Sequence, residues 1–276
     1  MFLHYMLTNQ KQRKVILMLS TVEIEQFEKE GYLLLSGLIS KEIIEKAEQA
    51  MWSTLGMDAD DPDSWEHVKR PFLTSFYIEN MAHEKRIELF GVTHPDLLEC
   101  CTPDYLTVLN QLAERYPTIP HCKSDHPDAI WAMNQFPISA EWRITSPHLD
   151  GYSRDLRLDP GSFRASSLTY LTDANSRQGT TVIWPEGPDR IREFRKQNPN
   201  LSNEIRTMLT QLPQIDLGEP MEVVAKQGDV LFFHHLLPHT GTINACSSPR
   251  FALRYMCLCF ECRPWQKRGE WNIWMP

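Results

Sequence analysis

The stretch Ser146-Pro147-His148-Leu149-Asp150-Gly151 holds the residues around which the rest of the chain is organised. Alternate side chains of an extended segment point to the same side, so His148 and Asp150 are expected to project together from one strand. An imidazole beside a carboxylate supplies two ligands of a 2-His-1-carboxylate site, the ligand set of non-haem Fe(II) oxygenases. A surface turn or a satisfied polar pair is the alternative interpretation.

The composition indicates a globular protein with a small-molecule substrate. The chain has 276 residues, 42% of them hydrophobic and 23% charged, which suits one large domain or two small ones. The formal net charge of −8 argues against a nucleic acid or an anionic membrane as the partner. We find no break in composition and no repeat, so we predict one domain. No pattern in the chain indicates an oligomeric state.

The seven cysteines are odd in number and irregularly spaced. This favours reduced thiols and a cytoplasmic location over a disulfide framework. Three of them, Cys257, Cys259 and Cys262, lie close enough in sequence to suggest a zinc cluster. The alternative is one apolar strand face, on which free cysteines pack as small hydrophobic residues. That face would consist of Phe251, Leu253, Tyr255, Cys257 and Cys259.

The N-terminal third is predicted to be an arm followed by helices. Residues 1–19 contain an apolar run too short for a secretory or membrane-spanning segment, and we predict a flexible arm. Ser20 and Glu23 form a capping box, which predicts a helix that ends at Gly31. After these come a short strand over 32–35, a second helix from Ser40 to near Gly56, and further helices between 72 and 112, broken by prolines.

After Pro120 the pattern changes to short strands rich in β-branched and aromatic residues, as in a β-sandwich or jelly roll. A helical excursion between Pro188 and Pro213, with Ser202 as a cap, interrupts them. We therefore predict a helical front over about 20–120, a β-core over about 121–265 and a tail over 266–276. The predicted strands are 130–136, 142–150, 166–172, 180–184, 221–226, 230–234 and 251–260.

The sequence offers the remaining parts of a site near the C-terminal end of the β-core. A turn at Gly228-Asp229 launches an apolar strand that ends at His234, and His235 and His239 follow. Any of the three histidines could be the third ligand. Arg250 lies on the next predicted strand, and its planar guanidinium suits a carboxylate. Without a bulge, one strand face would carry Arg250, Ala252, Arg254 and Met256, which invites an anionic ligand.

Taken in order, His148-x-Asp150, the Gly-Asp-Val-Leu-Phe-Phe-His strand, His239 and Arg250 closely resemble the phytanoyl-CoA dioxygenase family of Fe(II)/2-oxoglutarate oxygenases. The helix, strand and helix over 27–51 and the segment Gly179-Thr180-Thr181-Val182-Ile183-Trp184-Pro185 extend the resemblance to about 20–261. It implies an α+β fold: a double-stranded β-helix (jelly roll, cupin-like) core with N-terminal helices packed on it. The single oxygenase domain would span 20–265.

By this resemblance, Fe(II) is held by His148, Asp150 and His239, and Arg250 binds the distal carboxylate of 2-oxoglutarate. An amide ahead of the His-x-Asp, here Gln135 or Asn134, contacts the co-substrate. Many relatives have a serine two residues past the distal histidine. This chain has Gly241 there, and Thr240 or Thr242 would substitute. The loop after Trp184 also departs from the family pattern, with Pro185-Glu186-Gly187-Pro188 in place of proline-glycine-serine-histidine.

The implied activity is hydroxylation, or a similar oxidation, of a C–H bond with Fe(II), 2-oxoglutarate and O₂, releasing succinate and CO₂. Ascorbate is expected to stimulate it. The intact Asp150 favours hydroxylation over halogenation, because related halogenases replace this carboxylate with a small residue. The predicted substrate contacts are Arg143, Tyr152, Trp184 and Arg254, with Arg154 and Arg157 as further pocket residues.

Two other functions fit the same ligand set. One is a catalytically silent jelly-roll protein that binds the metal, with or without 2-oxoglutarate, and does not turn over, an alternative motivated by Gly241 and the altered loop. The other is a zinc hydrolase with the same two histidines and carboxylate. Arg250 has no role in a hydrolase of that kind.

Overall fold

The computed structural model describes residues 18–66, 76–80, 85–113, 130–150, 163–200 and 212–258. Helices dominate its beginning and short strands its remainder. The elements are α1 (Thr21–Glu30), β1 (Tyr32–Leu35), α2 (Lys41–Leu55), η1 (Pro62–Glu66), β2 (Phe76–Asn80), β3 (Arg86–Val92), α3 (Pro95–Leu98), α4 (Pro103–Ala113), β4 (Ile130–Gln135), β5 (Phe163–Tyr170), β6 (Thr181–Ile183), α5 (Gly187–Gln197), η2 (Leu212–Gln214), β7 (Met221–Val223), β8 (Val230–His234), β9 (His239–Gly241) and β10 (Arg250–Leu258).

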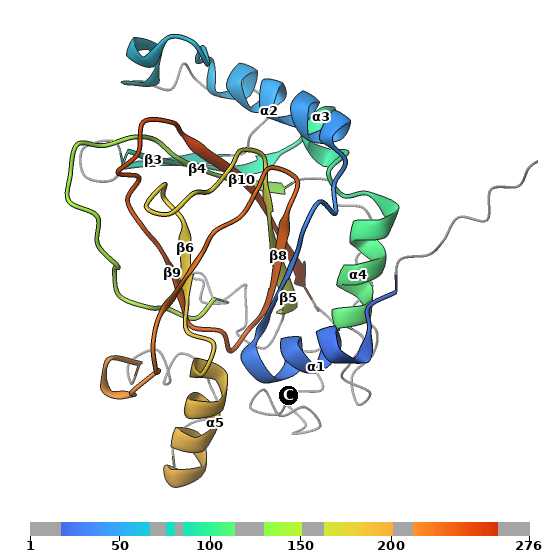
Figure 1. Cartoon of the computed structure of the whole chain (residues 1–276), viewed down its shortest axis with the longest axis vertical. Coiled ribbons are helices and arrows are strands. Elements are labelled where there is room, and N and C mark those ends of the chain that lie inside the picture. Colours follow the sequence, from blue (N-terminus) through green and yellow to red (C-terminus); the bar gives the residue numbers. More distant parts are fainter. Residues whose placement is uncertain are drawn as a thin grey trace, which may run out of the picture.

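The strands form two antiparallel sheets (Figure 1). The larger has seven strands in the order β1-β8-β5-β10-β4-β3-β2, and the smaller has the order β7-β6-β9. The strands β8, β5, β10 and β4 are neighbours in space but not consecutive in sequence, as expected of a jelly roll, whereas β4, β3 and β2 follow one another as a meander at one edge. The predicted α+β fold with a jelly-roll core is confirmed.

Two apolar cores lie on opposite faces of the large sheet. The helices α2 and α4 pack on its outer face, where Ile44, Met51 and Leu109 join Phe251 and Leu253 of β10 in one cluster. Figure 1 shows α2, α3 and α4 along the outside of the barrel. The second cluster fills the space between the sheets and contains Tyr170, Ile183, Leu231, Phe233 and Ala252. Alternation along β10 therefore turns Arg250 and Arg254 toward the small sheet.

The predicted start of the helical front is confirmed. The Ser20 hydroxyl accepts a hydrogen bond from the Glu23 N–H, and the Glu23 carboxylate accepts one from the Ser20 N–H. Gly31 ends α1 in the left-handed conformation, with φ of 82°. Ser40 is the N-cap of α2, although its side chain makes no capping hydrogen bond. No described helix is both long and apolar enough to span a bilayer.

Two local predictions need correction. Between 72 and 112 the structure has β2 and β3 ahead of α3 and α4, because Ile87 and Leu89 alternate with Glu88 at the strand period. The predicted strand over 142–150 is irregular, and only His148 forms a bridge there. The predicted helical excursion between Pro188 and Pro213 is present as α5, and its predicted cap, Ser202, lies outside the described residues.

Candidate metal centre

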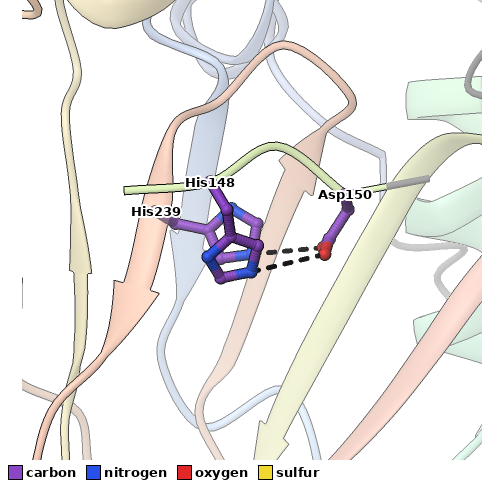
Figure 2. Close-up of side chains that lie close together, drawn as sticks. All are labelled: His148, Asp150 and His239. Atoms are coloured by element: carbon purple, nitrogen blue, oxygen red, sulfur yellow. Dashed lines mark ion pairs between the residues drawn. The ribbon is translucent and has the colours of Figure 1, made fainter. Parts of the chain in front are cut away.

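Three side chains from two distant segments meet at one end of the space between the sheets. His148 and His239 form an isolated antiparallel bridge, with N–H···O distances of 2.9 and 3.0 Å in the two directions. Their rings therefore lie side by side, with centroids 4.4 Å apart. Asp150 projects to the same side: its Oδ2 is 3.2 Å from Nε2 of His239, and its Oδ1 is 3.7 Å from Nε2 of His148 (Figure 2).

His234, the last residue of β8, and His235 lie outside this cluster. His234 packs edge-to-face on Phe27 and accepts the Leu236 N–H at its Nδ1. His235 is buried beside it, with ring centroids 5.5 Å apart. His239 is therefore the histidine that joins the His-x-Asp pair.

The charge states suit metal ligands. Nδ1 of His239 lies 3.0 Å from the Leu237 carbonyl, which can only accept, so Nδ1 carries a hydrogen and Nε2 is the ring nitrogen that faces Asp150. Partial enclosure of its ring and the neighbouring His239 lower the pKa of His148 to about 4, so this ring is neutral at pH 7. Burial opposes ionisation of Asp150, but the Arg254 guanidinium and His239 hold its pKa well below the usual range.

This donor set fits a divalent metal ion. Nε2 of His239 and a carboxylate oxygen of Asp150 lie 3.2 Å apart, and both atoms can bind a cation placed beside them. Ligands about 2.0–2.2 Å from an ion are roughly 3 Å apart when they occupy adjacent positions, close to the separations observed. Two histidines and one carboxylate on one side of an ion are typical of non-haem Fe(II) sites. Within the described residues, no other group of three such ligands comes together.

A cavity of about 250 Å³ opens beside the cluster, between the inner face of the large sheet and the small sheet. Its wall combines aromatic and apolar side chains with three arginines, and its other side is formed by β6 and β9. The lining residues are Arg86, Glu88, Trp131, Met133, Asn134, Gln135, His148, Asp150, Leu168, Thr181, Phe233, His239, Gly241, Arg250 and Arg254.

Arg250 is a buried cation without an anionic partner among the described residues. Its Nε donates to the Gly179 carbonyl at 2.8 Å and its Nη1 to the Met133 carbonyl at 2.9 Å. No described carboxylate lies within ion-pair distance of it, and burial lowers its pKa. A buried charge is costly unless it is paired. An anion bound in the cavity beside this guanidinium would supply the missing partner.

Gly179 supports Arg250 in a conformation that other residues disfavour. Its φ is 62°, and a Cβ there would lie 2.4 Å from Cγ of Gln135. Gly37 has the same φ of 62° but open space around it. We expect Gly37→Ala to cost about 1–2 kcal/mol of unfolding free energy from the backbone alone, and Gly179→Ala roughly 1–3 kcal/mol more from the clash. Urea denaturation of both variants measures the difference, and equal losses would contradict it.

The two amides proposed for the co-substrate lie on different faces of β4. Gln135 is in register with Arg250 on β10 and with Arg86 on β3, so it stands on the cavity wall between two arginines. Asn134 also borders the cavity, but it is in register with Phe251, which packs against the helices, and neither atom of its buried amide is hydrogen bonded. Gln135 is therefore the better placed of the two.

The structure places Thr240 and Thr242 away from the cavity. The Thr240 hydroxyl shares a short hydrogen bond with Thr145, and the Thr242 hydroxyl donates to the Thr180 carbonyl at 3.0 Å. His239 points inward, so the period of a strand turns Gly241 inward and both threonines outward. The hydroxyl that sequence reasoning missed is Thr181, which pairs with Gly241 in register and lines the cavity. The signal for it lay in the pairing of β6 with β9.

Of the predicted substrate contacts, only Arg254 lines the cavity among the residues that the structure describes. Arg143 is exposed. Trp184 packs in the helix-side core and is 8% exposed. Tyr152, Arg154 and Arg157 lie outside the described residues.

Comparisons with known proteins agree with this geometry. The family model described as phytanoyl-CoA dioxygenase (PhyH) matches residues 27–252. Among solved structures, the non-haem α-ketoglutarate-dependent carbocyclase SnoK of nogalamycin biosynthesis is 18% identical, with a TM-score of 0.57 over 86% of this chain and 84% of that one. EvdO2 from Micromonospora carbonacea is 17% identical, with a TM-score of 0.51 over 88% and 93% of the two chains.

A third similar structure is HygX from Streptomyces hygroscopicus with nickel and 2-oxoglutarate bound. It is 14% identical, with a TM-score of 0.50 over 86% of each chain. No curated protein sequence matches this chain. At these identities the solved structures show the shared fold alone.

Proposed function

This chain belongs to the phytanoyl-CoA dioxygenase family, and we propose that it is an Fe(II)- and 2-oxoglutarate-dependent dioxygenase that hydroxylates, or similarly oxidises, a C–H bond of a small molecule. The observation that carries the proposal is one cavity that joins the His148, Asp150 and His239 cluster to the unpaired guanidinium of Arg250. A co-substrate with a metal-binding end and a distal carboxylate fits that combination. The HygX structure with nickel and 2-oxoglutarate supports the choice of co-substrate.

Each part of the cavity has a role in this proposal. The two histidines and Asp150 hold the ion and leave its remaining positions open. When bound, Fe(II) supplies the activation of O₂ that side chains cannot, with ascorbate as a stimulant. One O₂ and one 2-oxoglutarate convert the substrate C–H to C–OH and leave succinate and CO₂. Leu168 and Phe233 line the cavity and keep water from the reacting atoms.

Arg250, Gln135 and Thr181 are proposed to bind the distal end of 2-oxoglutarate. Arg250 would form two charge-assisted hydrogen bonds to the carboxylate, for which its planar guanidinium is suited. Thr181 would supply the hydroxyl that relatives carry on the facing strand, because Gly241 leaves open space opposite it. Thr240 and Thr242 remain structural in this assignment, since their hydroxyls bond within the protein.

The substrate is proposed to be a small molecule, as in the neighbouring structure of HygX with hygromycin B bound. The cavity of about 250 Å³ has to accommodate the co-substrate as well. A cytoplasmic location is part of the proposal and rests on the irregular cysteine pattern, in which Cys100 and Cys101 are free and buried.

Succinate release tests the proposal. The protein is loaded with Fe(II) without oxygen, given 2-oxoglutarate and ascorbate, and then exposed to air with a panel of small molecules. We expect slow succinate formation alone and faster formation with a substrate, both dependent on Fe(II). A protein that binds the metal and 2-oxoglutarate but forms no succinate would instead be the catalytically silent binding protein. Absence of 2-oxoglutarate binding would point to a hydrolase-type site.

A further inference from the structure

Arg254 is held in one place by contacts on several sides. Its Nη2 donates a short hydrogen bond to Oδ2 of Asp150, and its Nε donates to the Ser166 hydroxyl at 3.3 Å. The guanidinium carbon lies 4.7 Å from the ring centroid of Trp131 and 5.8 Å from that of Phe233, within the range of cation–π attraction. The residue is 5% exposed. Few rotamers are compatible with all four contacts.

The strands explain why the guanidinium is so well fixed. Arg254 stands in the middle of the large sheet, in register with Trp131 on β4 and Leu168 on β5. Ser166 donates its own hydroxyl hydrogen to the Tyr255 carbonyl at 3.2 Å, so its lone pairs are free to accept from Arg254. The donor to Asp150 therefore stands on a strand that is paired on both sides.

The described part of its own segment gives Asp150 no comparable support. Residues 141–150 form no regular strand, and the bridge to β9 is made by His148 alone. No backbone N–H of the described residues donates to the Asp150 carboxylate. Its fixed neighbours are Arg254 and the two histidines. Its orientation thus depends on a side chain 104 residues away in sequence.

We propose that Arg254 is a positioning residue that holds the Asp150 carboxylate facing His148 and His239, ready to bind the metal ion. This replaces the substrate contact that the sequence suggested, because the guanidinium is committed to a ligand of the metal centre. The inference rests on the proposed function only in taking these three residues as the metal site. Neighbours that orient metal ligands typically contribute 10- to 100-fold to metal affinity.

The direction of the change in metal affinity distinguishes a positioning role of Arg254 from a purely electrostatic one. Removing a positive charge beside a site for a divalent cation should strengthen metal binding by Coulomb's law. Removing the group that orients a ligand should weaken it. Arg86 offers a matched control, because it carries the same charge on the same cavity wall but forms its ion pair with Glu88, at 3.3 Å, rather than with Asp150.

The experiment compares Ni(II) affinities of the purified full chain by calorimetry at about pH 8, where protons compete little for the ligands. We expect Arg254→Gln to bind Ni(II) about 10- to 100-fold more weakly than wild type. Arg254→Lys, which keeps one charged donor, should fall between them, and Arg86→Gln should bind as tightly as wild type or more tightly. Ser166→Ala should cause a smaller loss than Arg254→Gln.

Circular dichroism shows whether each variant is folded before titration. If Arg254→Gln does not fold, Arg254→Lys and Ser166→Ala carry the test. Affinity equal to or above that of wild type in the folded Arg254 variants would overturn the proposal. Failure of the proposed function is distinct, because wild type would then bind Ni(II) without binding 2-oxoglutarate or forming succinate.

Discussion

His239→Ala is expected to abolish metal-dependent activity and to weaken metal binding by more than the 10- to 100-fold typical of changes around a ligand. His239 is the only proposed ligand from β9, and its Nε2 faces Asp150 at 3.2 Å. Without it, two ligands from one irregular segment remain. Ni(II) at 100 times its dissociation constant should stabilise the wild type by about 2.7 kcal/mol, roughly 5–10 °C in melting temperature. The variant should show no such shift at the same concentration.

His94→Asn provides the control for this result. His94 is the N-cap of α3, where its side chain accepts the Asp96 N–H. Asparagine is a good capping residue, so the variant loses a histidine while it keeps the cap. Its metal-induced shift should match that of wild type. A His239→Ala protein that still gains the full shift would show that the ion binds elsewhere.

Local rules predicted the parts of the fold that local interactions determine. The capping box at Ser20 and the left-handed terminus at Gly31 are contacts within a single turn, and both are present. The His-x-Asp pair also followed from the period of an extended chain. The same period would have turned Thr240 and Thr242 away from the cavity once His239 pointed into it. That step needed only the choice of one histidine.

Choosing His239 rather than His234 or His235 required long-range contacts, which no local sequence pattern contains. His148 and His239 are brought together by a bridge between segments 91 positions apart. Thr181 reaches the cavity through the pairing of β6 with β9, and Arg254 reaches Asp150 across the sheet. The strand β3 was predicted as helix because Ile87 and Phe90 lie three positions apart, which is a helical spacing, and a short apolar run does not distinguish the two periods. Register and pairing, rather than propensity, decide these positions.

Replacing Arg250 with methionine is expected to remove most of the affinity for 2-oxoglutarate. Truncating one partner of a buried charge pair costs about 2–5 kcal/mol, which is roughly 30-fold or more in the dissociation constant. The stability of the folded protein should fall less than its affinity for 2-oxoglutarate, because Arg250 has no described anionic partner and bonds only to the Gly179 and Met133 carbonyls. Metal binding should persist, since the guanidinium touches none of the three ligands.

Calorimetric titration of the Ni(II)-loaded variants with 2-oxoglutarate separates these effects. Thr181→Val should lose less than Arg250→Met, about 1.5–3 kcal/mol for one hydrogen bond to a charged group. Thr242→Val, one residue after the end of β9, is its matched control, and its affinity for 2-oxoglutarate should equal that of wild type because its hydroxyl bonds to Thr180. If Arg250→Met bound 2-oxoglutarate as tightly as wild type, the distal carboxylate would have another partner. Equal losses of affinity in Thr181→Val and Thr242→Val would contradict the assignment of the hydroxyl contact to Thr181.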